Sequence, residues 1–395
     1  MVININFARD KVLQKFLKTL ELLQYGSITV ETPDRKKYHF VGKHPGSNAS
    51  LFIHNWRAII NLIAKGDVGL AEAYRDGWVD TDNLVNLLLA GLQNAKVLEH
   101  YIRGKFWSSW TSQLLYFFRL NTIKKAKHNI HKHYDLGNDF YSLWLDPSMT
   151  YSSALFLDPK DSLEQAQYNK YDRILQRLGN SSGNLLEIGC GWGGFIERAL
   201  NNGNDYGIKG ITISDSQLQF AKERLTDRAN IAFEDYRIQT GKYDHIVSIE
   251  MFEAVGEKYW PIYFQKIKSL LKNKGKAVIQ AICIEDNLFK QYRKSGDMIR
   301  TFIFPGGMLP SYARFNEEVK KTGLHVVDKL TFAKDYARTL TLWLQRFDER
   351  LSEIRKLNFD EKFIRIWRFY LASCIAGFTT ERINVMQIEL EHTRY

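Results

Sequence analysis

The residues best suited to chemistry lie in a glycine-rich turn near the middle of the chain. The turn follows the short apolar run Leu185–Ile188 and contains Gly189, Gly191, Gly193 and Gly194. An apolar run, closely spaced glycines and then helix-forming residues predict a buried strand, a tight turn and a helix start. Because glycine has no Cβ, its backbone can turn sharply and lie close to a ligand. The turn alone fits NAD, FAD, a phosphate or S-adenosylmethionine, although its spacing matches the dinucleotide fingerprint poorly.

The glycine turn is one of several loops that follow predicted strands in the second half of the chain. Apolar patterns predict strands over residues 185–188, 210–214, 231–233, 243–249 and 277–282. Helical patterns cover residues 163–178, 216–225 and 260–271. This alternation is typical of a mostly parallel sheet with helices on both faces. Ligands of such sheets bind beyond the carboxyl ends of the strands, so functional residues are expected just after each strand.

Polar residues do follow the other predicted strands. Thr212, Ser214 and Gln217 follow the second strand. Asp235 follows the third strand, and the acidic segment 250–256 follows the fourth. The Asp235 carboxylate can accept a hydrogen bond from an adenine amino group, although an ordinary loop carboxylate explains it as well.

The composition favours two domains and a negatively charged partner surface. The chain has 395 residues, a net charge of +11 and a pI near 9.3, which indicates nucleic acid or anionic lipid headgroups as partners. The cysteines, Cys190, Cys283 and Cys374, have no paired spacing, so we expect a reducing cytoplasm rather than a disulfide framework or a zinc site. The sequence has neither an apolar run of about 18 residues nor a recognisable secretory signal.

Residues 1–103 are predicted to form a smaller mixed domain. Helical patterns cover residues 7–22, 56–65 and 81–92, and strand-like alternation covers residues 27–32 and 37–41. A linker at 104–133 follows, in which bulky aromatics precede a cluster of basic residues. The linker suits an interfacial membrane contact, and it equally suits a core helix with a solvated charged segment. The larger predicted domain covers residues 134–395.

Several segments taken together resemble the cyclopropane-fatty-acyl-phospholipid synthase family. The Glu-x-Gly-x-Gly pattern that begins at Glu187 is similar to motif I of the S-adenosylmethionine methyltransferases. The other segments that resemble the family are residues 133–141, 149–154, 210–217, 234–237, 250–256, 304–310, 335–340 and 367–371. The smaller domain resembles that of the bacterial phospholipid-acting members at residues 69–78. The resemblance therefore covers nearly the whole chain.

The resemblance implies an α/β fold: a Rossmann-like class I methyltransferase domain with a smaller, lipid-interacting N-terminal domain. It implies methylene transfer from S-adenosylmethionine to the cis double bond of an unsaturated acyl chain in a membrane phospholipid, which forms a cyclopropane fatty acid. A dry pocket with aromatic faces would suit the transient cation of that reaction. The resemblance also implies a homodimer that associates peripherally with the inner membrane from the cytoplasm.

Position by position, the resemblance assigns two groups of residues. Those expected to line the S-adenosylmethionine site are Tyr151, Ser152, Gly189, Gly191, Gly193, Thr212, Gln217 and Asp235. Those expected at the catalytic centre are Glu253, Tyr336, Ser153 and Gln280. In the family, the residues that match Glu253 and Tyr336 help to hold a bicarbonate ion that serves as the base.

The expected catalytic centre departs from the family at two positions. Ser153 stands where many synthases have cysteine, and Gln280 stands where they have histidine. Both can donate hydrogen bonds, but neither supplies an imidazole. One outcome is an altered bicarbonate site with the same product; another is a methyl-branched or methylene product formed through a hydride shift. Cyclopropane formation is the first expectation and methyl branching the second.

Other functions stay open on the sequence alone. Plant alkaloid N-methyltransferases resemble the same catalytic domain, so a small-molecule N-methyltransferase is one alternative, and a catalytically inactive lipid-binding protein is another. Nucleic acid is not an expected partner, because the chain has neither an Asn-Pro-Pro-Tyr-type signature nor a Pro-Cys motif. No metal is expected either, because no carboxylate or cysteine completes a metal set with His128, His131 and His133.

Overall fold

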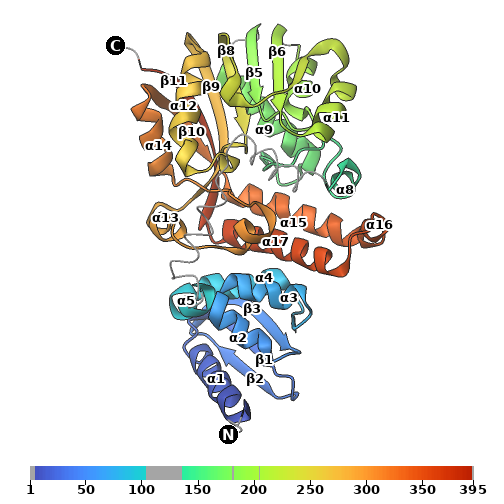
Figure 1. Ribbon diagram of the computed structural model, residues 1–395, viewed down its shortest axis with the longest axis vertical. Helices are drawn as coiled ribbons and strands as arrows, with labels where there is room; N and C mark the ends of the chain where they lie inside the picture. The colour runs from blue at the N-terminus through green and yellow to red at the C-terminus, as the bar shows by residue number, and fades with distance from the viewer. Residues whose placement is uncertain (1–4, 104–135, 180–181, 204, 394–395) are drawn as a thin grey trace. The chain divides into compact units, whose positions relative to one another are not determined.

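The chain folds into two compact units, each assembled from separate stretches of sequence. The computed structural model describes residues 5–103, 136–179, 182–203 and 205–393 (Figure 1). Among these, the first unit comprises residues 5–103, 291–303 and 351–380, and the second comprises residues 136–290, 304–350 and 381–393. The predicted linker at 104–133, which includes His128, His131 and His133, lies outside the described residues.

The first unit contains a four-stranded sheet with the strand order β2-β1-β3-β4. Its strands are β1 (Tyr25–Glu31), β2 (Lys37–Val41), β3 (His44–Ile53) and β4 (Val79–Asp80). Its helices are α1 (Ile5–Leu20), α2 (Arg57–Lys65), α3 (Asp67–Arg75), α4 (Leu84–Gln93), α5 (Ala95–Arg103), the π-helical turn η5 (Ile299–Ile303), α16 (Leu351–Lys356) and α17 (Glu361–Thr379). β1 pairs antiparallel with β2 and parallel with β3. The predicted first helix and hairpin are confirmed, whereas β3 and α3 were not predicted.

Helix α17 belongs to the first unit although it comes late in the sequence. Arg365 donates hydrogen bonds to the carbonyl oxygens of Tyr74 and Val79, the latter at 2.9 Å. The ring of Phe369 packs 5.9 Å from that of Tyr74. The linear division into domains at 1–103, 104–133 and 134–395 stays a prediction. In the described part of the chain, residues 291–303 and 351–380 belong to the same compact unit as residues 5–103.

The second unit contains a seven-stranded sheet with the order β10-β11-β9-β8-β5-β6-β7. Its strands are β5 (Ser182–Ile188), β6 (Asp205–Thr212), β7 (Asn230–Phe233), β8 (Tyr243–Ile249), β9 (Leu271–Ile284), β10 (Leu324–Thr331) and β11 (Ile383–His392). β5 to β9 pair in parallel, whereas β11 pairs antiparallel with both β9 and β10. The predicted mostly parallel sheet is confirmed, and its antiparallel edge was not predicted.

Helices cover both faces of this sheet (Figure 1). They are α8 (Asn138–Ser142), α9 (Leu163–Leu178), α10 (Gly194–Asn201), α11 (Asp215–Leu225), α12 (Trp260–Leu270), α14 (Tyr312–Lys321) and α15 (Ala333–Glu349). Short 3-10 turns are η1 (Thr226–Arg228), η2 (Tyr236–Ile238), η3 (Phe252–Ala254) and η4 (Glu257–Tyr259), and α13 (Asp286–Tyr292) runs across the boundary between the two units in the sequence. No helix among the described residues is both long and apolar enough to cross a bilayer.

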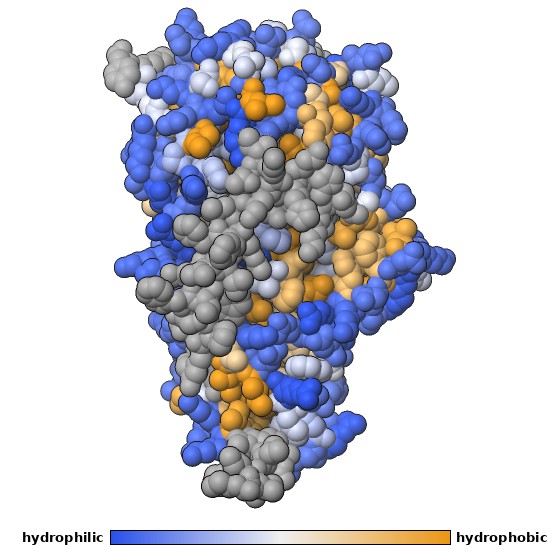
Figure 2. All heavy atoms as spheres, viewed as in Figure 1, coloured by the Kyte–Doolittle hydropathy of each residue, from blue (hydrophilic) through white to orange (hydrophobic). Residues whose placement is uncertain are grey.

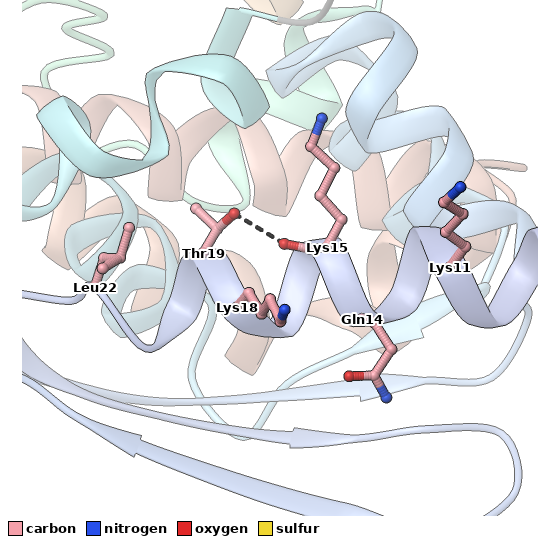
Figure 3. A pocket seen from close by; sticks show the side chains of 6 residues that line it. All are labelled: Lys11, Gln14, Lys15, Lys18, Thr19 and Leu22. Atoms are coloured by element: carbon pink, nitrogen blue, oxygen red, sulfur yellow. Dashed lines mark hydrogen bonds between the residues drawn. The ribbon is translucent and has the colours of Figure 1, made fainter.

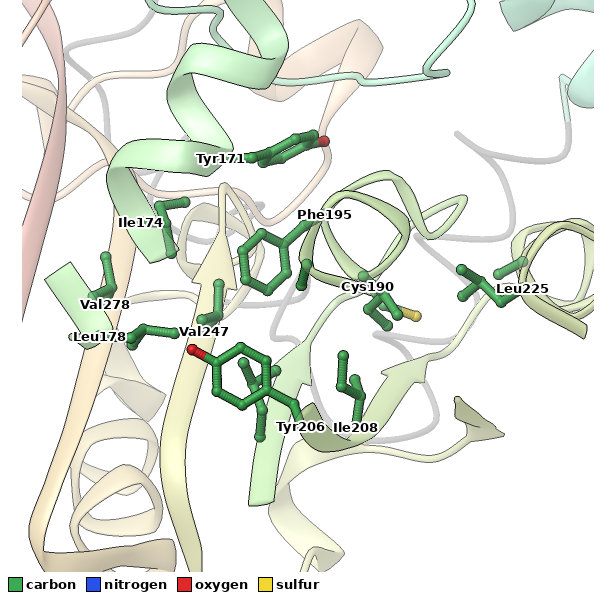
Figure 4. Packing of buried hydrophobic residues seen from close by; sticks show 14 of the residues in the cluster. Tyr171, Ile174, Leu178, Cys190, Phe195, Tyr206, Ile208, Leu225, Val247 and Val278 are labelled. Carbon is green, nitrogen blue, oxygen red and sulfur yellow. The ribbon is translucent and has the colours of Figure 1, made fainter. Parts of the chain in front are cut away.

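The apolar face of α9 packs onto the sheet and helps to fix the site above it. Ile174 and Leu178 lie in one buried cluster with Phe195 of α10, Val247 of β8 and Val278 of β9 (Figure 4). Ile174 and Leu178 are four residues apart, so they share one side of the helix. Burying these side chains holds α9 in place, and α9 carries polar groups that enter the site.

Polar caps set the ends of the helices that border the site. The side chain of Ser162 accepts a hydrogen bond from the Gln165 backbone at 3.1 Å, and Gly179 ends α9 with a φ of 81°. These two residues explain where α9 begins and ends, and the predicted helix 163–178 is confirmed. Ser214 caps α11 in the same way, so β6 ends at Thr212 and not at residue 214 as predicted.

Candidate active site

The glycine turn lies at the carboxyl end of β5, beside the end of β6. The backbone N–H groups of Gly189 and Cys190 donate to the Ile211 carbonyl oxygen at 2.9 and 3.0 Å, which ties the turn to β6. The φ angles are 81° at Gly189, 52° at Gly191 and 83° at Gly193, a left-handed conformation that glycine adopts readily. A Cβ added at Gly191 would meet no described atom within 4 Å. The backbone there borders open space, so a ligand can approach it closely.

The other predicted cofactor residues on the sheet lie at the same edge. The Thr212 hydroxyl donates to the Gln217 side-chain oxygen at 3.0 Å. The Asp235 carboxylate accepts from the Arg237 backbone N–H at 2.9 Å and pairs with the Arg237 guanidinium at 2.6 Å. Because β5, β6 and β7 are neighbours, the glycine turn and these side chains meet at one end of the sheet.

Tyr151 and Ser152 come from the segment before α9, and the Ser152 hydroxyl meets a buried lysine. The Lys170 ammonium donates hydrogen bonds to the Ser152 hydroxyl and to the Gln167 side-chain oxygen, both at 2.7 Å. Burial lowers the pKa of Lys170 to about 7, although nearby carboxylates, first among them Glu250, oppose that shift. Lys170 thus supplies a titratable cation inside the second unit.

Glu187, the acid of the motif at the end of β5, is also enclosed. Its side chain is buried, and its Oε2 atom has no hydrogen-bond partner among the described residues. Burial raises the pKa of Glu187 to about 8, and the charge of Lys170 partly opposes the shift. Glu187 is therefore a carboxyl that gains a proton readily in the folded protein.

Three donors converge on the carboxylate of Glu250, which directly follows β8. Its Oε1 atom accepts from the Ser153 backbone N–H at 2.8 Å and from the Gln280 amide at 2.7 Å. Its Oε2 atom accepts from the Tyr336 hydroxyl at 2.6 Å. Burial raises the pKa of Glu250, while these three hydrogen bonds and Lys170 oppose the rise. The structure thus brings together Ser153, Gln280 and Tyr336, three of the four predicted catalytic residues, around an acid that was not predicted to act.

A second row of polar groups fixes the direction of the Gln280 amide. Its oxygen accepts from the Gln387 amide at 2.9 Å, so its nitrogen must face Glu250. The oxygen of Gln387 accepts in turn from the Arg173 guanidinium at 2.8 Å. Because Arg173 can only donate, the chain of hydrogen bonds from Arg173 to Glu250 has one direction.

Glu253, the predicted catalytic acid, has different surroundings. Its Oε1 atom accepts from the backbone N–H of Ile282, and its Oε2 atom is buried without a hydrogen-bond partner among the described residues. Burial, and then the charge of Glu250, raise the pKa of Glu253 to about 8. The phenol hydrogen of Tyr336 goes to Glu250 and not to Glu253. The structure does not join the predicted pair Glu253 and Tyr336 by a hydrogen bond.

The Ser153 side chain likewise points elsewhere. Its hydroxyl donates to the Ala154 carbonyl oxygen at 3.0 Å, so only the Ser153 backbone reaches Glu250. The contact between Ser153 and the Glu250 carboxylate therefore depends on the path of the main chain and not on the Ser153 side chain.

Aromatic rings stand next to the carboxylate. The ring of Tyr336 lies 6.2 Å from that of Trp343, and the ring of Tyr151 lies 5.3 Å from Trp343 on another side. Trp144 packs edge-on to Tyr151 at 5.5 Å. Ring faces attract cations through their quadrupole, and the buried rings keep water away. A carboxylate beside such rings suits a reaction in which a cation forms and then loses a proton.

Sequence reasoning missed Glu250 and Lys170. Glu250 did carry a signal, because it directly follows the predicted strand 243–249 at the ligand edge. It also has a φ of 50°, which is uncommon for a residue with a Cβ and is often found at functional sites. Lys170 lies among the inward residues of α9, where a charged side chain needs a buried partner.

Comparisons with known proteins identify the family of the chain. Residues 121–388 match the mycolic acid cyclopropane synthetase family. The chain is 37% identical, over 86% of its length, to tuberculostearic acid methyltransferase UfaA1 from Mycobacterium tuberculosis, of which it covers 82%. It is 35% identical, over 83% of its length, to the cyclopropane-fatty-acyl-phospholipid synthase of Escherichia coli, of which it covers 84%.

A solved structure extends the agreement to the fold and the cofactor. Mycolic acid cyclopropane synthase CmaA1, complexed with SAH and CTAB, superposes with a TM-score of 0.62 and 29% identity, which covers 67% of this chain and 97% of that one. The predicted Rossmann-like methyltransferase fold and the predicted cofactor are thereby confirmed. The chain belongs to the mycolic acid cyclopropane synthetase family and is an S-adenosylmethionine-dependent methyltransferase that acts on lipid.

Proposed function

We propose that the enzyme transfers a methylene group to the cis double bond of an unsaturated acyl chain in a membrane phospholipid and forms a cyclopropane ring. The observation that carries this proposal is the hydrogen-bond network around the partly buried Glu250 carboxylate, beside the rings of Tyr336 and Trp343. S-adenosylmethionine supplies an electrophilic methyl group. The rings stabilise the cation left on the acyl chain, and a carboxylate next to them can take up a proton.

The cofactor residues have separable roles in this reaction. The glycine turn holds the ligand against bare backbone, and Asp235 is held at the sheet edge where it can accept a hydrogen bond from an adenine amino group. Thr212 and Gln217 border the same edge. Tyr151 packs on Trp343. Tyr141 links Tyr151 to the glycine turn, because its ring contacts both Tyr151 and Trp192.

A methylene-bearing or methyl-branched acyl chain is the second candidate product. Two observations favour it: Gln280 replaces the expected imidazole, and one relative is named a tuberculostearic acid methyltransferase. After methyl transfer, a hydride shift would move the cation to the methylated carbon, and loss of a methyl proton would then leave a methylene group. A saturated branch would need a separate hydride donor.

The lipid surface is proposed to meet the first unit. Helix α1 presents the exposed lysines Lys11, Lys15 and Lys18 along a shallow pocket that also borders Leu22 (Figure 3). Leu22, Val41 and Ile60 of this unit are 59%, 68% and 58% exposed. Figure 2 shows that apolar side chains gather in only a few areas of an otherwise hydrophilic face. Lysines beside the exposed Leu22 side chain suit anionic headgroups and the acyl boundary. Peripheral association with the inner membrane and a homodimer belong to the same proposal.

Product analysis tests this function. The purified full-length protein is incubated with methyl-labelled S-adenosylmethionine and vesicles of a phospholipid with cis-monounsaturated chains, and the acyl products are identified by mass spectrometry. We expect a gain of one CH₂ per labelled chain. A ring survives mild catalytic hydrogenation, whereas a methylene product takes up two hydrogens, so this step separates the two candidates.

Vesicles of a fully saturated phospholipid are the control and should remain unlabelled. Cofactor binding without any lipid labelling would contradict the proposal and favour a small-molecule methyltransferase. Labelling of saturated chains would exclude attack by a double bond.

A further inference from the structure

On the basis of the proposed function, we propose that the Glu250 carboxylate is itself the base that takes the proton after methyl transfer, in place of a bound bicarbonate ion. Bicarbonate and a carboxylate share a planar, three-atom anionic face. Three of the four residues expected at the bicarbonate site donate to Glu250: Tyr336 and Gln280 through their side chains, and Ser153 through its backbone N–H. The Glu250 side chain thus occupies the position expected for the bicarbonate ion.

The donors do not fit an additional bicarbonate ion. The Ser153 N–H and the Tyr336 O–H have one hydrogen each, and both are directed at Glu250. A bicarbonate on the same donors would have to displace the carboxylate or lie against it, anion beside anion. Gln280 cannot turn to offer its oxygen, because Gln387 and Arg173 fix its direction.

The Glu250 carboxylate can still accept a proton, as a base must. Its Oε1 atom accepts two hydrogen bonds and is saturated, whereas Oε2, among the residues that the structure describes, accepts only the bond from Tyr336 and retains a lone pair. The Glu250 side chain is only partly buried, so a substrate group can reach it. Burial raises its pKa, which strengthens it as a base.

The proton transfer balances without another reactant. A C–H bond of the added methyl group breaks, the proton goes to Oε2 of Glu250, and the electron pair forms the carbon–carbon bond that closes the ring. For the methylene product the same proton loss forms a carbon–carbon double bond. Glu250 then returns the proton to water after the product leaves.

Glycine at position 250 provides the sharpest test, because glycine accepts the φ of 50° and removes the carboxylate. The wild type and Glu250→Gly are titrated with ¹³C-labelled bicarbonate and followed by ¹³C line broadening. We expect saturable binding by Glu250→Gly and none by the wild type. Saturable binding by the wild type would overturn the proposal.

Turnover on unsaturated phospholipid vesicles in bicarbonate-depleted buffer gives the second readout. We expect wild-type kcat to change by less than about twofold on depletion, and Glu250→Gln to lose at least about 100-fold. Calorimetry should show unchanged S-adenosylmethionine affinity in Glu250→Gln. Added bicarbonate or formate should raise the kcat of Glu250→Gly at least about tenfold. Wild-type turnover that falls on depletion and returns with bicarbonate would refute the proposal.

Glu381 offers a matched control, since it is an exposed glutamate with a φ of 53°. Glu381→Gln and Glu381→Gly should leave turnover unchanged and should not bind bicarbonate. If the wild type makes no lipid product, the proposed function fails. The bicarbonate titration still decides whether Glu250 occupies the anion position.

Discussion

The charged groups with a proposed role lie at the surface of the first unit and inside the second. In the first unit, Lys11, Lys15 and Lys18 are exposed along α1. In the second, Glu250 and Lys170 are held among hydrogen-bond partners at the carboxyl edge of the sheet. Salt screens exposed charges beyond about 10 Å, so they act on a surface that comes close, whereas enclosed charges are screened less and act strongly on whatever enters the site. We therefore expect surface contact from the first unit and chemistry from the second, and four predictions test this difference.

The largest effect is expected from the lysines of α1. Replacing Lys11, Lys15 and Lys18 together by alanine should weaken binding to anionic vesicles by about 3 kcal/mol, or roughly 100-fold, because each lysine near such a surface contributes about 1 kcal/mol. Vesicle co-sedimentation at low salt measures the change. Turnover on detergent-dispersed phospholipid should stay as in the wild type.

The matched control removes three exposed lysines from the second unit. The substitutions Lys222→Ala, Lys242→Ala and Lys274→Ala change the net charge equally. They should weaken vesicle binding much less. Equal losses from both triple variants would show that net charge, and not α1, attracts the membrane.

Stability should depend on pH through Glu187. Its pKa rises from an ordinary 4.5 to about 8 in the fold, so its stabilising contribution is complete below 4.5 and is lost as the pH rises through 8. Between pH 6 and 7.5 this group should cost the wild type up to about 2 kcal/mol of unfolding free energy. Glu187→Gln stays neutral, so its chemical denaturation midpoint should fall less over that interval.

In the first unit, Asp67 is the carboxyl whose raised pKa corresponds to that of Glu187. Burial, and then the charge of Asp297, raise its pKa to about 7. Asp67→Asn should flatten the same pH profile between pH 5 and 7. A profile unchanged by both substitutions would contradict the protonation of these buried carboxyls.

A smaller effect is expected from Tyr336→Phe. Loss of one hydrogen bond to a charged group costs about 1.5 kcal/mol, so kcat should fall about tenfold. Vesicle binding should not change, because Tyr336 belongs to the second unit. A large change in vesicle binding would break the separation between the units.

The smallest effect is expected from Ser153→Ala. The Ser153 hydroxyl donates to the Ala154 carbonyl oxygen, and alanine retains the N–H that reaches Glu250. Steady-state kinetics should therefore show less than about threefold loss of kcat. A loss as large as that of Tyr336→Phe would mean that the hydroxyl takes part in the reaction.

Much of the second unit could be predicted from the sequence, because its signals are local. Helix 163–178 begins after the cap Ser162 and ends at Gly179, both of which are visible in the sequence. The apolar strands and the glycine turn are also local patterns. The cofactor edge follows from them, since parallel strands bring their carboxyl ends together.

The unpredicted parts depend on contacts between distant residues. β11 pairs with β9 about 100 residues earlier in the sequence, and no local pattern specifies that partner. Glu250 and Glu253 lie three residues apart in one acidic segment, and only the folded chain shows that the donors reach Glu250. A resemblance assigns a role to a position in a motif, but it does not show which neighbouring acid the donors contact.

The pairing of β11 with β9 has a consequence for synthesis of the enzyme. Gln387 lies opposite Gln280 in this register, so the support for the Glu250 network comes from a stretch that is translated about 100 residues after Gln280. A nascent chain can form its glycine turn much earlier while it is still attached to the ribosome. It can therefore form the cofactor turn before the hydrogen bonds that direct the Gln280 amide toward Glu250 exist.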